Sequence, residues 1–301
     1  MNAFFQNLMQ TKENNTFALK TIDNILNFFK NHWYYILLCS VLVLAVSYRI
    51  ETYAINRQFW YDEAQLALNY ITNSGVLWVF KPLDNLQVAP PLFLAVVKLF
   101  TIMFGTSEYV FRLFPFLVSL ASVFVFYKLT KRFLKTKHSI IIANVLFAIS
   151  FQMTRFSSEF KQYGCDSLIF MLALMWLGEI NTNKLTLRQV LQYSIVFAIL
   201  FFLSQPVIFA LFGFTLYNVL KNYKNYKIYL IPIIPVFCAF IYKFSMPKFL
   251  RDFMDSFWGN EAGFISFNNL PDFLEGNYEF FLQGSSYMAP MLPLLIIGLY
   301  L

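Results

Sequence analysis

The stretch that decides the fold is 109–137, YVFRLFPFLVSLASVFVFYKLTKRFLKTK, in which a long apolar run leads directly into a cluster of basic residues. A helix needs about 20 largely apolar residues to cross the hydrocarbon core of a bilayer, and the run 109–129 meets that requirement. Short connectors rich in Lys and Arg are typical of the cytoplasmic side of membrane proteins. The stretch therefore predicts a membrane-spanning helix whose carboxyl end lies at the cytoplasmic face.

The composition of the whole chain also indicates a lipid environment. Of its 301 residues, 58% are hydrophobic and only 13% are charged, and the mean hydropathy is +0.56. About 25% of the residues of an ordinary soluble domain are charged, so this chain has too little charge to cover a water-exposed surface. The formal net charge of +7 lies mostly in short connectors and not in a separate basic domain, which argues against a nucleic-acid partner.

Six further apolar runs are candidates for membrane-spanning helices: 33–53, 138–154, 165–180, 190–205, 207–221 and 228–245. The predicted fold class is therefore all-α, a polytopic transmembrane helical bundle across 33–245. The polar residues 1–32 form a cytoplasmic N-terminal segment, and we expect the first span to remain uncleaved. The prediction is a multi-pass protein of the inner or plasma membrane, surrounded by the lipid bilayer.

The apolar segment 91–105 decides the orientation of every later element. If it crossed the membrane, the connectors 128–137, 181–189 and 221–227, with ten Lys and Arg residues among them, would lie outside the cell. Because basic connectors stay in the cytoplasm, we expect 91–105 to lie along the outer interface. Three external segments follow from this orientation: 54–108, 154–164 and 246–287.

The final run, 288–301, is apolar but shorter than a membrane span. A crossing helix needs about 20 residues, and no polar exit follows this run. We therefore expect it to be the start of a further, incomplete transmembrane helix in a C-terminally truncated chain.

Two adjacent acids, Asp62 and Glu63, come shortly after the first span and open a helical pattern over 62–73. One interpretation is structural, because acidic side chains cap helix N-termini and stabilise them through the helix dipole. The other is chemical, because a carboxylate at the membrane surface can accept a proton or bind a metal ion. The residues alone leave both interpretations open.

A Pro-Pro element and an arginine follow in the same external loop. The prolines at 90–91 are expected to forbid a helix and to force an extended backbone, with Gln87 close by. Arg112 opens the next apolar run. An arginine in such a run either points into a protein interior or extends its charged end to the interface.

The second external loop concentrates ionisable residues between two apolar runs. It reads RFSSEFKQYGCD from Arg155 to Asp166. At helical spacing, four polar side chains would share one face: Glu159, Gln162, Tyr163 and Asp166. The loop is either a solvated connector or part of a site, although a connector has no need of Asp166 inside the next apolar run.

The order of these features resembles the membrane glycosyltransferases of the GT-C superfamily, in particular the branch of protein mannosyltransferases and aminoarabinose transferases. Four short motifs across 33–245 carry the resemblance: WYDEA at 60–64, APPLF at 89–93, the stretch from Gly105 to RLFP at 112–115, and SSEFKQY at 157–163 with Asp166. The resemblance implies a multi-span helical bundle with juxtamembrane helices in the first external loop.

The resemblance also implies an activity, the transfer of a sugar from a polyprenyl-phosphate donor to a lipid, glycan or protein acceptor on the non-cytoplasmic face. In that activity Asp62 is the principal catalytic carboxylate, with Glu63 beside it and Asp166 as the acid of the second loop. Three basic residues are expected to hold the carrier phosphate: Arg155, Lys161 and Arg112. Donor or acceptor contacts are expected from three more residues: Glu159, Tyr163 and Gln87.

The resemblance leaves a divalent metal ion open as a cofactor, and its ligands stay unknown. Related enzymes often carry His or an acid–base pair at the Pro-Pro element, where this chain has Val88 and Ala89. No other cofactor is expected.

A non-enzymatic transporter or flippase of a lipid or oligosaccharide is the alternative. Transporters typically contain inverted repeats and helices that break near the membrane midplane. In this chain the acids gather at one membrane face, and Ser204-Gln205-Pro206 interrupts an apolar stretch at an expected external turn. These features favour the enzyme.

Overall fold

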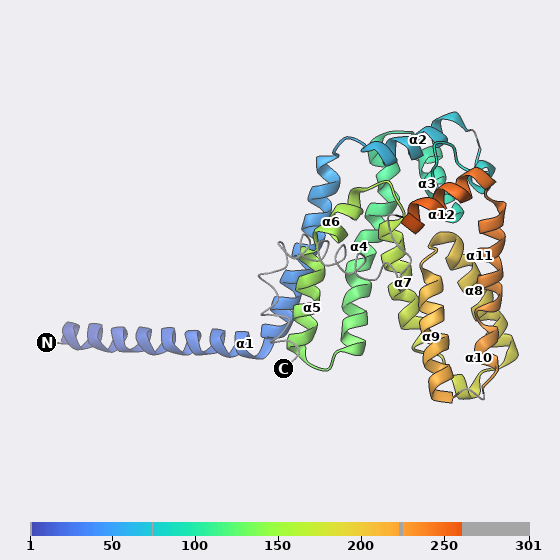
Figure 1. Cartoon of the computed structure of the whole chain (residues 1–301). Coiled ribbons are helices and arrows are strands. Elements are labelled where there is room, and N and C mark those ends of the chain that lie inside the picture. The colour runs from blue at the N-terminus through green and yellow to red at the C-terminus, as the bar shows by residue number, and fades with distance from the viewer. Residues whose placement is uncertain (1, 74, 223–224, 261–301) are drawn as a thin grey trace.

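The computed structural model describes residues 2–73, 75–222 and 225–260, and within these ranges the chain is helical and contains no strand. The all-α prediction is therefore confirmed for the part of the chain that is described. Figure 1 shows the elements, which follow in this order: α1 (Asn2–Ile55), α2 (Tyr61–Thr72), η1 (Leu77–Phe80), α3 (Pro91–Phe104), α4 (Glu108–Phe133), α5 (Lys137–Ile149), α6 (Phe151–Arg155), η2 (Phe156–Ser158), α7 (Tyr163–Leu177), η3 (Thr182–Lys184), α8 (Leu187–Leu203), α9 (Val207–Asn222), α10 (Lys227–Leu230), α11 (Ile233–Ser245) and α12 (Lys248–Asn260).

Three of the described helices are long and apolar enough to cross a membrane. They are Asn27–Ile55, Glu108–Phe133 and Lys227–Ser245, and the bent pair of Lys137–Ile149 and Phe151–Ser158 adds a fourth if it forms one span. Helices α7, α8 and α9 are also apolar but have only 15, 17 and 16 residues. The structure thus supports three or four membrane-length elements, while the seven-span bundle stays a prediction.

The expected span 138–154 is interrupted. Helix α5 ends at Ile149, and the chain bends by 55° between α5 and the segment that follows it. Ser150 explains the interruption, because its hydroxyl accepts a hydrogen bond from the backbone N–H of Met153 (3.4 Å) and caps a new helix. The bend directs the second external loop toward α4.

The Pro-Pro element starts a helix, so the expectation of an extended backbone through 90–91 is wrong. Helix α3 begins at Pro91, and Pro90 alone is extended. A proline is tolerated at the first helical position because its missing N–H would have no helical partner there. The 14 residues of α3 span about 21 Å, which is less than a hydrocarbon core of about 30 Å.

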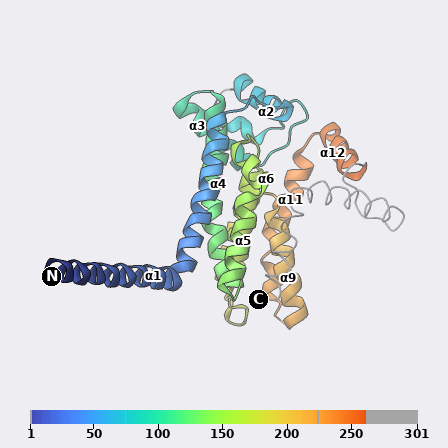
Figure 2. The ribbon, with the colours of Figure 1, turned by 90° about the vertical axis from the view of Figure 1, so that its left-hand side faces the viewer.

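Lys98, in the middle of α3, has a structural role. Its Nζ donates hydrogen bonds to the backbone carbonyls of Tyr70 (3.2 Å) and Asn73 (3.1 Å) at the end of α2. The last carbonyls of a helix lack helical partners, and a cation beside them also interacts favourably with the helix dipole. Lys98 thus fastens α3 to α2, and both views show these helices together at one end of the molecule (Figures 1 and 2).

Aromatic packing holds the second external loop against α2 and α4. Phe160 is fully buried, and its ring centroid lies 4.9 Å from that of Phe111 and 5.3 Å from that of Tyr70. A second buried cluster joins α7, α8, α9 and α11, while α1 packs on α4 and α5. The core therefore fixes the segment that carries Glu159 and Lys161.

Basic connectors lie at the end of the molecule opposite to α2 and α3. The end of α4, the start of α5 and the end of α9 are all found there (Figure 1). At the end of α4, Arg132 forms an ion pair with Glu179 (2.7 Å). The length of the helices therefore separates these connectors from the charges of the first two external loops.

Two predicted segments fall partly or wholly outside the described residues. The expected third external loop, 246–287, contains α12 up to Asn260, and its remainder is outside the described ranges. The expected incomplete helix at 288–301 is outside them as well.

Candidate functional site

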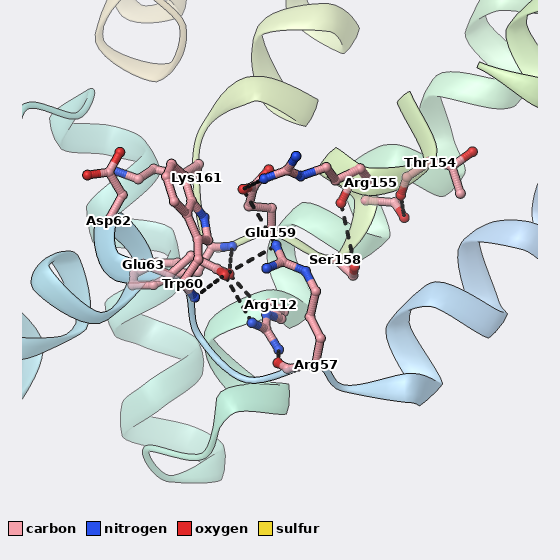
Figure 3. Close-up of polar contacts among 12 residues, drawn as sticks. Arg57, Trp60, Asp62, Glu63, Arg112, Thr154, Arg155, Ser158, Glu159 and Lys161 are labelled. Atoms are coloured by element: carbon pink, nitrogen blue, oxygen red, sulfur yellow. Dashed lines mark hydrogen bonds and ion pairs between the residues drawn. The ribbon is translucent and has the colours of Figure 1, made fainter. Parts of the chain in front are cut away.

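The first turn of α2 sends its two acids in different directions. Successive residues on a helix do not face the same neighbours. The Glu63 side chain is fully buried, whereas the Asp62 side chain is 36% exposed. Figure 3 shows the Glu63 carboxylate turned toward the arginines and the Asp62 carboxylate on the other side, near Lys161. The two acids therefore have different environments despite their adjacency.

Glu63 is the centre of a buried ion network. Its carboxylate accepts two hydrogen bonds from Arg112, one from Nε and one from Nη2 (3.0 Å each), and lies 3.2 Å from Nη2 of Arg57. It also accepts hydrogen bonds from the backbone N–H groups of Phe160 (2.6 Å) and Trp60 (3.4 Å). A bidentate arginine pair is among the strongest polar contacts in proteins. Glu63 thus ties α2 to α4 and to the second external loop.

Arg112 is fully buried, so it points into the protein interior and does not extend to the interface. Beyond Glu63, its Nη1 donates to the side chain of Asn56 (3.1 Å) and to the backbone carbonyl of Arg57. Its guanidinium also lies over the ring of Phe59 (4.7 Å). Because these contacts occupy the guanidinium, the predicted direct contact with a carrier phosphate has no support in this geometry.

The expected helical face of the second loop is only partly formed. Glu159 has an extended backbone, and α7 begins later, at Tyr163. Glu159 therefore does not share a helical face with Asp166, although Gln162 and Asp166, one turn apart, do. The buried ring of Phe160, and not helical spacing, positions this part of the loop, because it anchors the backbone between Glu159 and Lys161.

Lys161 connects Asp62 to the Pro-Pro loop. Its Nζ donates a hydrogen bond to Oε1 of Gln87 (2.7 Å) and lies 3.7 Å from Oδ2 of Asp62. Burial lowers the pKa of Lys161, and the nearby Asp62 carboxylate opposes that shift. Lys161 is therefore a buried cation beside a carboxylate that solvent and ligands can reach.

The loop that presents Gln87 is strained. Asn85 and Leu86 both have positive φ angles, 59° and 55°, which is uncommon for residues other than glycine and costs energy for a residue such as leucine. Asn69 of α2 holds this loop, because its side-chain oxygen accepts a hydrogen bond from the backbone N–H of Asp84 (2.8 Å). Strain that the surroundings maintain is a feature of functional sites.

Glu159 is a second buried carboxylate with positively charged neighbours. Its Oε1 lies 3.5 Å from Nη2 of Arg57 and 3.7 Å from Nη2 of Arg155, while its Oε2 is buried without a hydrogen-bond partner. Burial raises the pKa of Glu159, and the two arginines counteract that shift. The indole Nε1 of Trp60 is also buried and unpaired, and Arg155 lies 5.9 Å from that ring.

Tyr163 and Asp166 lie next to this cluster. The ring of Tyr163 packs on Phe156 (4.8 Å between centroids), and its hydroxyl is within electrostatic reach of Asp62, Glu159 and Asp166. The structure therefore brings the predicted residues of both external loops into one region. Their catalytic and binding roles stay predictions.

Several members of the cluster were not predicted from the sequence. Arg57 forms ion pairs with Glu63 and Glu159, and Phe160 and Asn56 complete the surroundings of Glu63 and Arg112. Arg57 could have been found as a cation in the same external loop as the acidic pair. No sequence signal identifies Phe160 or Asn56, because their contacts join positions far apart in the chain.

A cavity of about 170 Å³ adjoins the cluster. It lies between the loop before α3 and the ends of α8, α11 and α12, and its lining is mostly apolar. Gln87 and Tyr242 line it, and the Tyr242 hydroxyl donates to the backbone carbonyl of Ala89 (3.2 Å). Gln87 is thus shared by the cavity and by the contact with Lys161.

Carboxylates near cations, and not a metal-ligand set, characterise the region. Among the described residues, no three His, Cys, Asp or Glu side chains are grouped closely enough to hold a metal ion. The chain matches no protein-family model, no curated protein sequence and no solved structure.

Proposed function

We propose that the protein is a membrane glycosyltransferase that moves a sugar from a polyprenyl-phosphate donor to a hydroxyl of a lipid, glycan or protein acceptor. One observation carries the proposal. Asp62 is a partly exposed carboxylate that lies 3.7 Å from Lys161. It directly precedes Glu63, which forms ion pairs with Arg57 and Arg112. A base for the acceptor and positive charge for a leaving phosphate are the two groups that such a transfer requires.

Asp62 acts as the general base. It takes the proton of the acceptor hydroxyl while the hydroxyl oxygen forms a bond to the anomeric carbon of the sugar. The bond between that carbon and the phosphate oxygen breaks, and its electron pair remains with the polyprenyl phosphate. Lys161, whose Nζ lies 3.7 Å from Oδ2 of Asp62, holds the carboxylate in place for this step.

Arg57 and Arg155 bind the phosphate of the carrier. Their side chains are 31% and 44% exposed, and Nη2 of Arg57 has no hydrogen-bond partner among the described residues, so it has donor capacity left for a ligand. The unpaired Nε1 of Trp60 lies in the same region and can donate a further hydrogen bond. Arginine suits this role because its planar fork matches the geometry of phosphate oxygens.

Glu63 and Arg112 position the reacting groups without contacting them. Both are fully buried, and the network between them joins α2, α4 and the backbone of Phe160. This network fixes the first turn of α2, and with it Asp62, relative to Lys161.

The orientation follows from the separation of charges along the helices. The basic connectors are at one end of the molecule, and the cluster around Glu63 is at the other, beside α2 (Figures 1 and 3). With the basic connectors in the cytoplasm, the N-terminus is cytoplasmic and the reaction takes place on the non-cytoplasmic face of the inner or plasma membrane.

Cysteine accessibility tests this orientation. In a chain whose three native cysteines are replaced by alanine, Lys81→Cys and Lys135→Cys introduce single thiols at exposed positions of opposite ends. A membrane-impermeant maleimide should label the thiol at position 81 in intact cells and the thiol at position 135 only after lysis. The reverse pattern contradicts the proposed orientation.

Reconstitution tests the reaction. Purified protein in liposomes is supplied with a panel of polyprenyl-phosphate pentoses and hexoses, labelled in the sugar, together with lipid, glycan and peptide acceptors. We expect label to move from the carrier to one class of acceptor, with release of polyprenyl phosphate. Movement of labelled donor between leaflets without a new product would instead identify a flippase.

A further inference from the structure

Ser204, Gln205 and Pro206 interrupt the apolar stretch and form the turn between α8 and α9. None of these three residues has a role in the proposed reaction. Helix α8 ends at Leu203, and α9 begins at Val207. The backbone N–H of Val207 donates to the carbonyl of Ser204 (3.3 Å), so the turn is closed by the backbone. The side chain of Ser204 is free to serve another purpose.

Ser204 is fully buried, yet its hydroxyl has no hydrogen-bond partner. Serine just before a helix commonly caps it by accepting a backbone N–H, but this hydroxyl caps nothing. The hydroxyl is close enough to the carboxylate of Asp166 to favour its charged form, and Oδ1 of that carboxylate is buried without a partner among the described residues. Buried polar groups with unused hydrogen-bonding capacity are rare in proteins, and here one on α7 and one in the α8–α9 turn lie near each other.

Gln162 provides a third unpaired oxygen. Its Oε1 is buried without a partner, and its backbone carbonyl accepts the N–H of Asp166 (2.9 Å), one helical turn away. Residues at this spacing share a face of the helix. The face of α7 that carries Asp166 therefore presents two acceptor oxygens, and Ser204 adds a hydroxyl that can both accept and donate.

The chemistry of these groups selects a neutral ligand with several hydroxyls. A phosphate is disfavoured, because the three groups offer oxygen acceptors and a single hydroxyl but no cation. A ligand hydroxyl fits well, because it donates to the carboxyl or amide oxygen and accepts from the serine.

The position of the group relates it to the reaction centre. Tyr163 is within electrostatic reach of both Asp62 and Asp166, and it follows Lys161 closely in the chain. The sugar ring is the part of the donor that carries several hydroxyls, so it is the part that this group, near the same tyrosine as Asp62, would bind.

We infer that Asp166, Ser204 and Gln162 form the subsite that binds hydroxyls of the donor's sugar ring and sets which sugar is accepted. This inference rests on the proposed function, because it presumes a sugar-bearing polyprenyl phosphate as the donor. It assigns a role to the α8–α9 turn, which belongs to neither of the two external loops with the candidate catalytic residues.

Direct binding tests the subsite without requiring catalysis. Dissociation constants of the purified full chain are measured for sugar-free polyprenyl phosphate, for the tightest-binding polyprenyl-phosphate sugar of the panel, and for monodeoxy derivatives of that sugar. Ser204→Ala should weaken binding of the sugar-bearing carrier by about three- to tenfold and leave binding of the sugar-free carrier unchanged. One monodeoxy derivative lacks the sugar hydroxyl that Ser204 binds. This derivative should bind the wild-type protein and Ser204→Ala equally well, because neither complex then contains that hydrogen bond.

Two further variants complete the design. Ser194→Ala removes another buried serine of α8, one that donates to the backbone carbonyl of Ile231 (2.6 Å), and it should leave the sugar preference unchanged. Asp166→Asn keeps the size of the side chain and should also lower the affinity for the sugar-bearing carrier selectively, which secures the test if Ser204→Ala is unstable.

The outcomes separate the inference from the proposed function. If Ser204→Ala and Asp166→Asn bind both carriers as the wild type does, or weaken both equally, the subsite is refuted while the transferase proposal stands. If the wild-type protein binds neither carrier, the proposed function fails and the inference fails with it.

Discussion

Two regions of the same helical turn differ sharply: the buried ion network around Glu63, and the partly open pair formed by Asp62 and Lys161. In the first region each Glu63 oxygen accepts hydrogen bonds from Arg112 or the backbone of Phe160, and Arg57 adds an ion pair. In the second, the partly exposed carboxylate of Asp62 forms an ion pair with Lys161. The difference indicates that a carboxylate whose hydrogen-bond positions are all filled stabilises the fold and positions its neighbours. A carboxylate with unfilled positions can bind a ligand and take part in a reaction.

The largest expected effect comes from Asp62→Asn. Removing a general base typically lowers a rate by about 10²- to 10⁴-fold, so sugar transfer by reconstituted protein should fall by that factor. The thermal unfolding midpoint in detergent should stay close to that of the wild type, because Asp62 is partly exposed. Transfer at the wild-type rate would remove Asp62 from the mechanism.

Glu63→Gln tests the structural role of the buried ion network around Glu63. Breaking a buried ion pair leaves an uncompensated charge, here on Arg112, and costs about 3–5 kcal/mol. The free energy of unfolding, measured by denaturant titration in mixed micelles, should fall by that amount. As a control, Glu179→Gln breaks the exposed pair with Arg132 and should cost about 1 kcal/mol or less.

The result for Glu63→Gln can also contradict the assigned role. If the variant unfolds at the same free energy as the wild type but no longer transfers sugar, Glu63 acts in the chemistry and not in positioning. The positioning role would then no longer apply to Glu63.

The smallest expected effect is a pH dependence at Lys161. Burial lowers the pKa of Lys161 below its ordinary value of 10.5, so its ammonium loses its proton at a lower pH than an exposed lysine does. Lys161 adds positive charge near Glu159 and the two arginines that bind the phosphate, so affinity for polyprenyl phosphate should decline as the pH rises through that lowered pKa. Lys161→Arg should retain the affinity over the same range, because a guanidinium keeps its charge.

Lys135→Arg provides the matched control for this titration. Lys135 is exposed and belongs to the connector at the opposite end of the molecule. The variant should show the same decline with pH as the wild type. A decline that also persists in Lys161→Arg would assign the titration to another group.

Local sequence patterns predicted several elements well. The acids and apolar positions of 62–73 predict α2, which forms over Tyr61–Thr72, and the short apolar segment 91–105 forms α3. The prolines at 90–91 do not exclude a helix, because Pro91 fits the first helical position. The break at Ser150 has no distinct sequence signal, since a serine in an apolar run also fits an unbroken helix.

The different environments of Asp62 and Glu63 could not be predicted from sequence spacing. Asp62 and Glu63 differ because the backbone N–H of Phe160, far along the chain, lies within hydrogen-bond distance of only one of them. The role of Lys98 likewise depends on carbonyls of α2 that become accessible only when α2 and α3 pack together. These contacts are tertiary, and a single sequence carries no direct signal for them.

The side chain of Gln87 links two binding sites, that of the carrier phosphate and the neighbouring cavity. Its amide oxygen accepts a hydrogen bond from Nζ of Lys161, and the same residue lines the neighbouring cavity. A molecule in that cavity that rotated the amide would release Lys161 to interact with a carrier phosphate. Thermodynamic reciprocity then requires that a bound phosphate raise the affinity of the cavity by the same factor. A single amide would thereby make the binding of two substrates cooperative.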